Sequence, residues 1–211
     1  MVTPTRYDCI NPASIDVTLG SQVRVYDAVV SVGWKAPWAI NGWQVRPRRG
    51  ILYAIADWIL GRPLAVLDAA TPHPRTTAIT VRHGEPFLLR PGVGYLMHTY
   101  ETITPGEYVV VVDGKSSVGR LFCKVHETAG YVDPGFSGTV TLEVTVEHPT
   151  IIYGGMRIGQ IRAHTVVGGA KSYAECGRYT GDAARGAVPS HAWKQLREDG
   201  IVDGDGGVLQ W

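Results

Sequence analysis

The sequence predicts an all-β protein, a sandwich or jelly-roll-like barrel, with one or two short helices. Three observations lead to this prediction. Short apolar or alternating runs follow one another along the chain, and turn residues separate most of them. The 211 residues include 26 Gly and 13 Pro, which supply these turns. Only residues 50–60 depart from the pattern, with apolar side chains at helical spacing before Gly61 and Pro63.

The predicted strands are short, and each is bounded by turn residues. In chain order they are Ile15–Leu19, Val23–Val30, Ala78–Val81, Pro86–Leu89, Tyr95–His98, Tyr108–Val112, Leu121–Val125, Thr139–Val146, Ile151–Tyr153 and Gln160–Val167. In Thr139–Val146 apolar and polar residues alternate strictly, which is typical of a half-buried strand, and its polar face has Glu143.

Composition restricts the classes of function. A 45% hydrophobic content suits a globular protein with one core, and a formal net charge of +1 implies no general attraction to nucleic acid or membranes. No apolar run is long enough to span a bilayer and no signal peptide is evident, so we expect a cytoplasmic protein. The three cysteines lack C-x-x-C spacing, which argues against a disulfide framework and a zinc site, and Cys9 and Cys123 are predicted to be buried.

Residues 113–143 concentrate the polar chemistry of the chain. Asp113-Gly114 forms a turn signal, and a polar loop with two hydroxyls and two cations suited to an anion follows it: Lys115, Ser116, Ser117 and Arg120. A second turn signal, Asp133-Pro134-Gly135, precedes the strand that contains Glu143. As isolated features these residues are also compatible with ordinary turns, a surface salt bridge and a solvated strand face.

Taken together, these motifs resemble the dCTP deaminases of the trimeric dUTPase-like all-β superfamily. The resemblance rests on Gly114–Leu121, Thr128–Gly138 and Thr141–Glu143, with further matches at Asn11–Gly20, Phe87–Gly92 and Gly155–Gln160. It implies a distorted β-barrel or jelly roll that spans residues 1–190 as a single domain. Within it, residues 33–78 form an enlarged insert, and residues 191–211 follow as a C-terminal tail that we expect to be flexible.

The Trp-rich insert is longer than the corresponding part of the family. Its four tryptophans favour an accessory packing layer or an oligomer contact over a base-stacking surface: Trp34, Trp38, Trp43 and Trp58.

The resemblance also implies the roles of individual residues. Glu143 is the expected general acid and base, with Arg120 and Ser116 positioning the water that attacks C4 of cytosine. Substrate binding is expected from Lys115, Ser117, Ala129, Tyr131, Val132, Asp133, Gln160, Tyr173 and Arg178. Lys115 and Ser117 would contact the phosphates, and Asp133 the deoxyribose, although Asp133 is also a good turn former. Gln160 either orients water or stabilises a subunit contact.

The expected cofactor is Mg²⁺, bound through the substrate phosphates, and no zinc is expected. His83-Gly84-Glu85 matches the H-x-E signature of zinc deaminases, but the chain lacks the accompanying P-C-x-x-C ligands. At the C-terminal arm, Arg178 and Asp182 replace the lysine and glutamine usual in the family. This departure bears on how the arm would bind a triphosphate.

Three functions follow from these motifs. The first is deamination of dCTP to dUTP and ammonia, and we favour it on sequence alone. The second is the bifunctional reaction, in which the triphosphate is also hydrolysed to give dUMP and pyrophosphate. The Thr128–Gly138 run resembles members of that bifunctional group, and Gly130 leaves room at a position where other deaminases have a histidine. The third is a non-catalytic nucleotide-sensing or protein-binding module. The resemblance further implies a homotrimer with a deoxycytidine or deoxyuridine nucleotide at each subunit interface.

Overall fold

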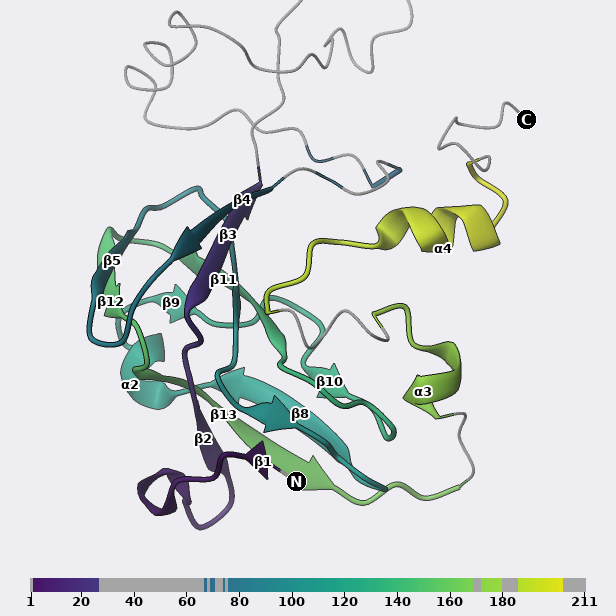
Figure 1. Ribbon diagram of the computed structural model, residues 1–211, viewed down its shortest axis with the longest axis horizontal. Coiled ribbons are helices and arrows are strands. Elements are labelled where there is room, and N and C mark those ends of the chain that lie inside the picture. Colours follow the sequence, from purple (N-terminus) through teal and green to yellow (C-terminus); the bar gives the residue numbers. More distant parts are fainter. Residues whose placement is uncertain are drawn as a thin grey trace, which may run out of the picture. The chain divides into compact units, whose positions relative to one another are not determined.

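The fold is built mainly of β-strands, as a computed structural model of the chain shows (Figure 1). The structure describes residues 2–26, 67, 69–70, 74, 76–168, 172–179 and 186–202. Helical segments are short in this part of the chain. The predicted all-β class is therefore confirmed. The helix predicted at residues 50–60 lies outside the described residues.

The strands are β1 (Val2–Thr3), β2 (Ile15–Thr18), β3 (Gln22–Tyr26), β4 (Thr76–Thr80), β5 (Pro86–Leu89), β6 (Tyr95–His98), β7 (Thr102–Ile103), β8 (Val109–Gly114), β9 (Cys123–Lys124), β10 (Tyr131–Val132), β11 (Thr141–Val146), β12 (Thr150–Tyr153) and β13 (Arg157–His164). A 3-10 turn, η1 (Tyr7–Cys9), precedes β2. The α-helices are α2 (Ser116–Gly119), α3 (Tyr173–Cys176) and α4 (Ala192–Glu198).

Two main sheets form the body of the fold. One has four strands in the order β10-β8-β13-β2, and the other has five in the order β4-β3-β6-β11-β9. Two-stranded pairs, β1-β7 and β12-β5, complete the pattern. Strand β11 pairs antiparallel with β6 and β9, for example Glu143 of β11 opposite Leu96 of β6, and β13 pairs antiparallel with β2 and β8. Figure 1 shows β8 and β13 side by side, with β10 at the edge of their sheet.

The core contains apolar residues from both main sheets. On β11 the buried residues Leu142, Val144 and Val146 alternate with half-buried ones, as predicted from the sequence. The cysteines at positions 9 and 123 are buried and unpaired, which confirms the prediction for both. Each strand of this kind buries one face because successive side chains point to opposite sides of a sheet.

Several strands differ in length from their predictions. The predicted strand Leu121–Val125 shortens to β9, and Gln160–Val167 becomes β13, which begins earlier at Arg157. Three short strands, β1, β7 and β10, were not predicted, because strands of two residues have too little alternation to stand out. Part of the predicted Val23–Val30, residues 27–30, lies outside the described residues.

The polar segment after β8 is helical rather than an open loop. Residues Ser116–Gly119 form α2, and the carbonyl of Lys115 accepts hydrogen bonds from the amides of Val118 and Gly119 at 2.9 and 2.8 Å. Val118 is buried and anchors this turn in the core. Phe122, directly after it, has φ of 54° although it is not glycine. Such a left-handed residue ends the turn and redirects the chain into β9.

Two buried polar side chains in the core, Glu101 and His98, are satisfied by hydrogen bonds. The carboxylate of Glu101 accepts from the amide and the hydroxyl of Thr18 at 2.9 and 2.7 Å. His98 contacts the carbonyl of Thr99 through Nδ1 and accepts from the amide of Gln22 through Nε2. Burial lowers the pKa of His98, which keeps this histidine neutral in the arrangement observed.

The chain divides into two compact units. The first comprises Met1–Val25 with Ala78–Pro189, and the second Tyr26–Thr77 with Ser190–Trp211. All of the predicted site residues belong to the first unit. The single domain of residues 1–190, its insert at residues 33–78 and the flexible tail at residues 191–211 stay predictions. Most of the insert lies outside the described residues, and the described part of the tail includes α4.

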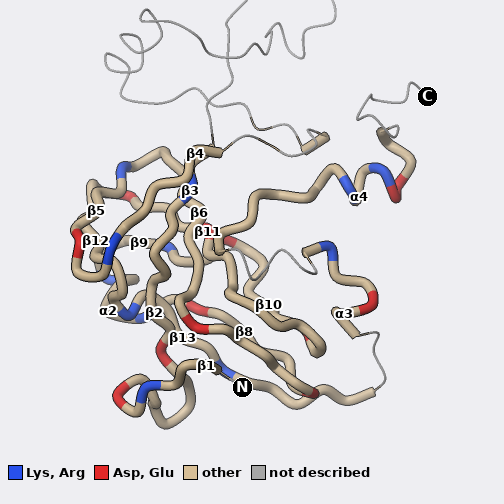
Figure 2. Tube along the Cα trace, in the orientation of Figure 1, with Lys and Arg blue, Asp and Glu red and all other residues tan. Residues whose placement is uncertain are grey.

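Basic and acidic residues are interspersed along the described chain, with neither sign confined to one part (Figure 2). This distribution agrees with the formal net charge of +1. Within the described residues, no helix has both the length and the apolar character needed to cross a membrane.

A close backbone contact between Gly130 and β8 gives a test of the fold. The amide of Val112 donates to the carbonyl of Gly130 at 2.7 Å, and a Cβ added at Gly130 would lie 2.6 Å from the carbonyl oxygen of Val112. We therefore expect Gly130→Ala to lower the free energy of unfolding by about 1–3 kcal/mol, because the backbone pairing must open. Chemical denaturation measures this change.

Gly119→Ala is the matched control. An added Cβ at Gly119 meets no atom within 4 Å, and alanine suits a helical position. If both variants have the same stability as the unaltered protein, the close packing of Gly130 against β8 is wrong.

Candidate active site

The predicted site residues come from both main sheets. Glu143 lies in the middle of β11, in the five-stranded sheet. Ser116, Ser117 and Arg120 lie on or next to α2, after β8 of the four-stranded sheet. The others lie in the loop between β9 and β10, on β10 and in the turn after it, on β13, and in the segment around α3. The fold must therefore assemble any common site across its sheets and loops.

Glu143 is bound by a histidine that the sequence analysis did not single out. Nδ1 of His126 forms an ion pair with Oε2 of Glu143, and neither atom has a hydrogen-bond partner elsewhere in the described residues. The other ring nitrogen, Nε2, lies 2.9 Å from the carbonyl oxygen of Ala129. His126 therefore connects the predicted catalytic carboxylate with the backbone of a predicted substrate-binding residue.

Burial and charge act in opposite directions on His126. The His126 side chain is 8% exposed and that of Glu143 is 41% exposed. Burial lowers the pKa of His126, but the hydrogen bond and charge of Glu143, helped by the carbonyl of Ala129, outweigh this and raise the pKa above its ordinary value. Because a carbonyl only accepts, Nε2 must bear a proton, so a charged imidazolium suits both contacts.

The α2 segment places its hydroxyls and its arginine at the surface. Ser116, Ser117 and Arg120 are exposed, and their side chains make no hydrogen bond or ion pair with the described part of the chain, Glu143 included. Lys115 differs from them. Its Nζ lies 2.6 Å from Oδ2 of Asp16, a carboxylate on β2. Within the described part of one chain, Arg120 and Ser116 thus form no hydrogen bond or ion pair with Glu143.

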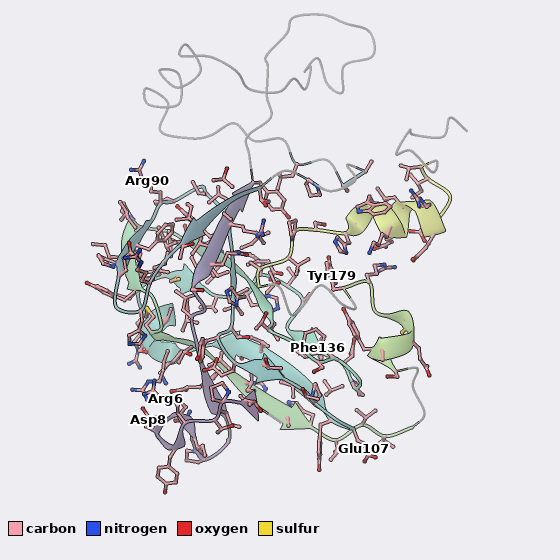
Figure 3. The ribbon with its side chains drawn as sticks, viewed as in Figure 1. Arg6, Asp8, Arg90, Glu107, Phe136 and Tyr179 are labelled. Carbon is pink, nitrogen blue, oxygen red and sulfur yellow. The ribbon has the colours of Figure 1, made fainter. Side chains whose placement is uncertain are left out.

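The loop after β10 is packed against α3. The amide of Tyr173 donates to the carbonyl of Pro134 at 2.8 Å, and the rings of Phe136 and Tyr173 meet edge to face with centroids 5.5 Å apart. Figure 3 shows Phe136 between β10 and α3. This packing brings Tyr173 next to the turn that contains Asp133, so these two predicted substrate-binding residues can contribute to one surface. Burial raises the pKa of Tyr173, so its hydroxyl stays protonated at neutral pH.

The remaining predicted residues are spread around this region. Tyr131 is 72% exposed on β10, whereas the neighbouring Val132 is buried. Arg178 follows α3 and is exposed. Gln160 lies on β13, in the four-stranded sheet, where its Oε1 is 3.4 Å from the hydroxyl of Ser14. Asp182 lies outside the described residues.

A C-terminal segment lies along the strand that contains Glu143. The amide of Val188 donates to the hydroxyl of Thr141 at 3.1 Å, and Gly186 and Ala187 are buried. Thr141 and Glu143 share one face of β11 because they are two residues apart. The sequence resembles the family only loosely in this segment, so its contact with β11 was not foreseen.

The H-x-E signature has a simple structural role. Gly84 has φ of 75°, and the amide of Glu85 donates to the carbonyl of Arg82, which makes a tight turn between β4 and β5. The carboxylate of Glu85 accepts from the amide of Arg82 at 2.8 Å. The described residues contain no group of three or more His, Cys, Asp or Glu side chains that could hold a metal ion.

The contact between Glu143 and His126 can be tested by NMR titration of the histidines. In a Glu143→Gln variant we expect the pKa of His126 to fall below its value in the unaltered protein, because burial then acts without the carboxylate charge. His98 is the internal control, since burial lowers its pKa and Glu143 is not among the groups that shift it. An unchanged His126 titration would contradict the observed pairing.

The same raised pKa has a consequence for stability. The folded state of the unaltered protein binds the His126 proton more tightly than the unfolded chain does. The stabilisation from this contact is therefore complete below the unfolded pKa and is lost as the pH rises through the folded pKa.

Comparisons with known proteins identify the family. The sequence model of a family described as dCTP deaminase-like matches residues 48–166, more than half of the chain. A protein of Thermobifida fusca (strain YX) named "dCTP deaminase, dUMP-forming" is 41% identical over 147 residues, which cover 66% of this chain and 74% of the relative. One of Dictyoglomus thermophilum with the same name is 49% identical over 94 residues, 43% of this chain and 48% of the relative.

Among solved structures, 2'-deoxycytidine 5'-triphosphate deaminase from Agrobacterium tumefaciens is similar with a TM-score of 0.49 and 20% identity. The match covers 78% of this chain and 42% of that chain. The family match contains α2, the Asp133 turn and Glu143 together. The chain therefore belongs to the dCTP deaminase-like family.

Proposed function

We propose that this protein is a bifunctional dCTP deaminase that converts dCTP to dUMP, pyrophosphate and ammonia. The observation that supports this most strongly is the similarity, at about 40% identity, to relatives named "dCTP deaminase, dUMP-forming". From the sequence alone we favoured dUTP as the product, and these names support the dUMP-forming alternative better. The overall change is balanced by two waters, one for the deamination and one for release of pyrophosphate.

Glu143 is the residue to which we assign the proton transfers of deamination. Water attacks C4 of the cytosine, and its proton passes through the carboxylate to N3 and to the departing ammonia. The position of Glu143 supports this role, since its carboxylate is partly exposed on a strand whose other face is buried. His126 contacts the same carboxylate and holds it in place beside the loop of Ala129.

The nucleotide would lie against the surface formed by the Asp133 turn and α3. Tyr131 and Tyr173 present aromatic rings there, and the packing of Phe136 on Tyr173 fixes the turn relative to the helix. In this proposal the carboxylate of Asp133 accepts from the 3′-hydroxyl of the deoxyribose. The described residues contain no group of three or more His, Cys, Asp or Glu side chains that could hold a metal ion. In this proposal a Mg²⁺ ion is held mainly by the phosphate oxygens, whose charge it neutralises.

The assembly that we propose is a homotrimer with a site at each subunit interface. In one chain Arg120 and Ser116 point to solvent without a partner among the described residues, while Glu143 is bound to His126. A complete site therefore needs α2 of one subunit next to β11 of another. A head-to-tail contact that closes after three copies forms such sites without leaving an open edge.

The reaction can be tested by product analysis. Pure protein incubated with dCTP and Mg²⁺ should yield dUMP and pyrophosphate, with little dUTP accumulating, and chromatography separates these nucleotides. Activity should require Mg²⁺ and survive a zinc-selective chelator. Accumulation of dUTP would indicate a deaminase without the second activity. Unchanged dCTP that is nevertheless bound would favour a nucleotide-sensing module, and restoration by zinc alone would contradict the assignment of Glu143.

Glu143→Gln is the control for the chemical step in the same assay. The amide keeps the shape of the side chain but cannot transfer protons, so deamination should fall by about 10²-fold or more while dCTP binding remains. Retention of more than about a tenth of the rate would contradict the proton-transfer role.

Subunit mixing tests the shared site. Glu143→Gln and Arg120→Ala chains should each be inactive alone, and mixed trimers should regain part of the activity because some interfaces then contain both intact residues. Light scattering checks the assembly. A stable, active monomer would refute the shared site, whereas a trimer that shows no complementation would place both residues at the same site from one chain.

A further inference from the structure

Asp16 is a buried charge that the proposed reaction does not use. It lies on β2 opposite Gln160 of β13, and its side chain is 1% exposed. A carboxylate removed from water in this way destabilises the fold unless charged and hydrogen-bonding partners surround it. The partners of Asp16 therefore indicate which parts of the fold depend on it.

Three side chains surround the Asp16 carboxylate. Nζ of Lys115 lies 2.6 Å from Oδ2, and Nδ2 of Asn11 donates to Oδ1 at 2.9 Å. Arg157 is farther away, with Nη1 at 3.8 Å from Oδ2, and it also donates to the carbonyl of Asp8. Lys115 is thus the close cationic partner. Its side chain is only 24% exposed.

Lys115 is also the residue from which α2 begins. Its carbonyl accepts from the amides of Val118 and Gly119, so its position sets the first turn of α2. Its side chain reaches across to a strand that lies 99 residues away in the sequence. The Lys115–Asp16 ion pair therefore ties the segment with Ser116, Ser117 and Arg120 to the four-stranded sheet.

We propose that Asp16 is a positioning residue for α2, and that Lys115 acts through Asp16 rather than as a direct ligand of the substrate phosphates. The inference rests on the proposed function for its consequence in nucleotide binding, but not for the structural role of the pair. It changes the role that the family resemblance implies for Lys115. A cation paired with a buried carboxylate has little net charge left to attract a phosphate.

Two readings of Lys115 predict opposite effects of Asp16→Asn. If Lys115 contacts the phosphates directly, neutralising Asp16 frees the cation, and dCTP binding strengthens or stays the same. If the pair positions α2, Asp16→Asn and Lys115→Met both weaken dCTP binding, by about tenfold, because α2 must then be ordered when the nucleotide binds. The double variant should then be no weaker than the weaker single variant, because both act on one contact.

Calorimetric titration with dCTP on the full-length chain, with Glu143→Gln present to prevent turnover, measures these affinities. Lys124→Met is the matched control. It removes a surface lysine whose ion pair with Glu147 spans 3.6 Å and is more than half exposed, so its loss should leave dCTP binding unchanged. Tighter or unchanged binding in Asp16→Asn would overturn the proposal.

Asp16→Glu keeps the inference testable if Asp16→Asn does not fold. Its charge is unchanged, but one extra methylene displaces Lys115 and with it the start of α2. The positioning role predicts weaker dCTP binding, because keeping the negative charge does not restore the geometry of the ion pair with Lys115. Affinity equal to that of the unaltered protein would contradict it.

Hydrogen exchange separates this inference from the proposed function. In nucleotide-free protein, the amides of Val118 and Gly119 should exchange faster in Asp16→Asn, Asp16→Glu and Lys115→Met, while β11 and the Lys124→Met control keep their protection. Unchanged exchange at Val118 and Gly119 would overturn the positioning role even if dCTP binds. Conversely, faster exchange in a protein that never binds dCTP would support the positioning role and refute the proposed function.

Discussion

Strand β11 can bury only one of its faces, and this constraint decides where the candidate site lies. Leu142, Val144 and Val146 fill the core between the sheets, so Glu143 must point to the opposite side. Pairing with β6 on one side and β9 on the other fixes the strand in register. The carboxylate is therefore held on a rigid element of the fold.

The loops are fixed by hydrogen bonds and close packing rather than by regular structure. His126 ties the β9–β10 loop to Glu143 through one ring nitrogen and to the carbonyl of Ala129 through the other. The packing of Phe136 on Tyr173 secures the next turn against α3. Because each loop has at least one such contact, their side chains can be placed precisely without an extended sheet beneath them.

Buried polar groups connect parts of the chain that are distant in sequence. Asp16 joins β2 to Lys115, and Glu101 is bound by the backbone and hydroxyl of Thr18. Such groups cost free energy when left without partners, so each one constrains the segment that satisfies it. In this protein one constrained segment is α2, which contains Ser116 and is followed by Arg120, two residues that the family resemblance associates with catalysis.

By itself the sequence determined the all-β class, most strand positions, the alternation of β11 and the burial of Cys9 and Cys123. These follow from local patterns, since a period of two and turn residues can be read within a few positions. Its motifs also indicated the family. Short strands such as β10 and the helical turn α2 were missed, because two to four residues carry little periodic signal.

Only the tertiary structure decided which side chains meet. The sequence does not show that His126 binds Glu143 or that Lys115 pairs with Asp16, because the partners come from separate strands and loops. It also does not show that Glu143 pairs with His126 rather than with Arg120 within one chain. Such contacts depend on how the sheets pack and on the need of each buried charge for a partner, and neither condition is encoded in the spacing of neighbouring residues.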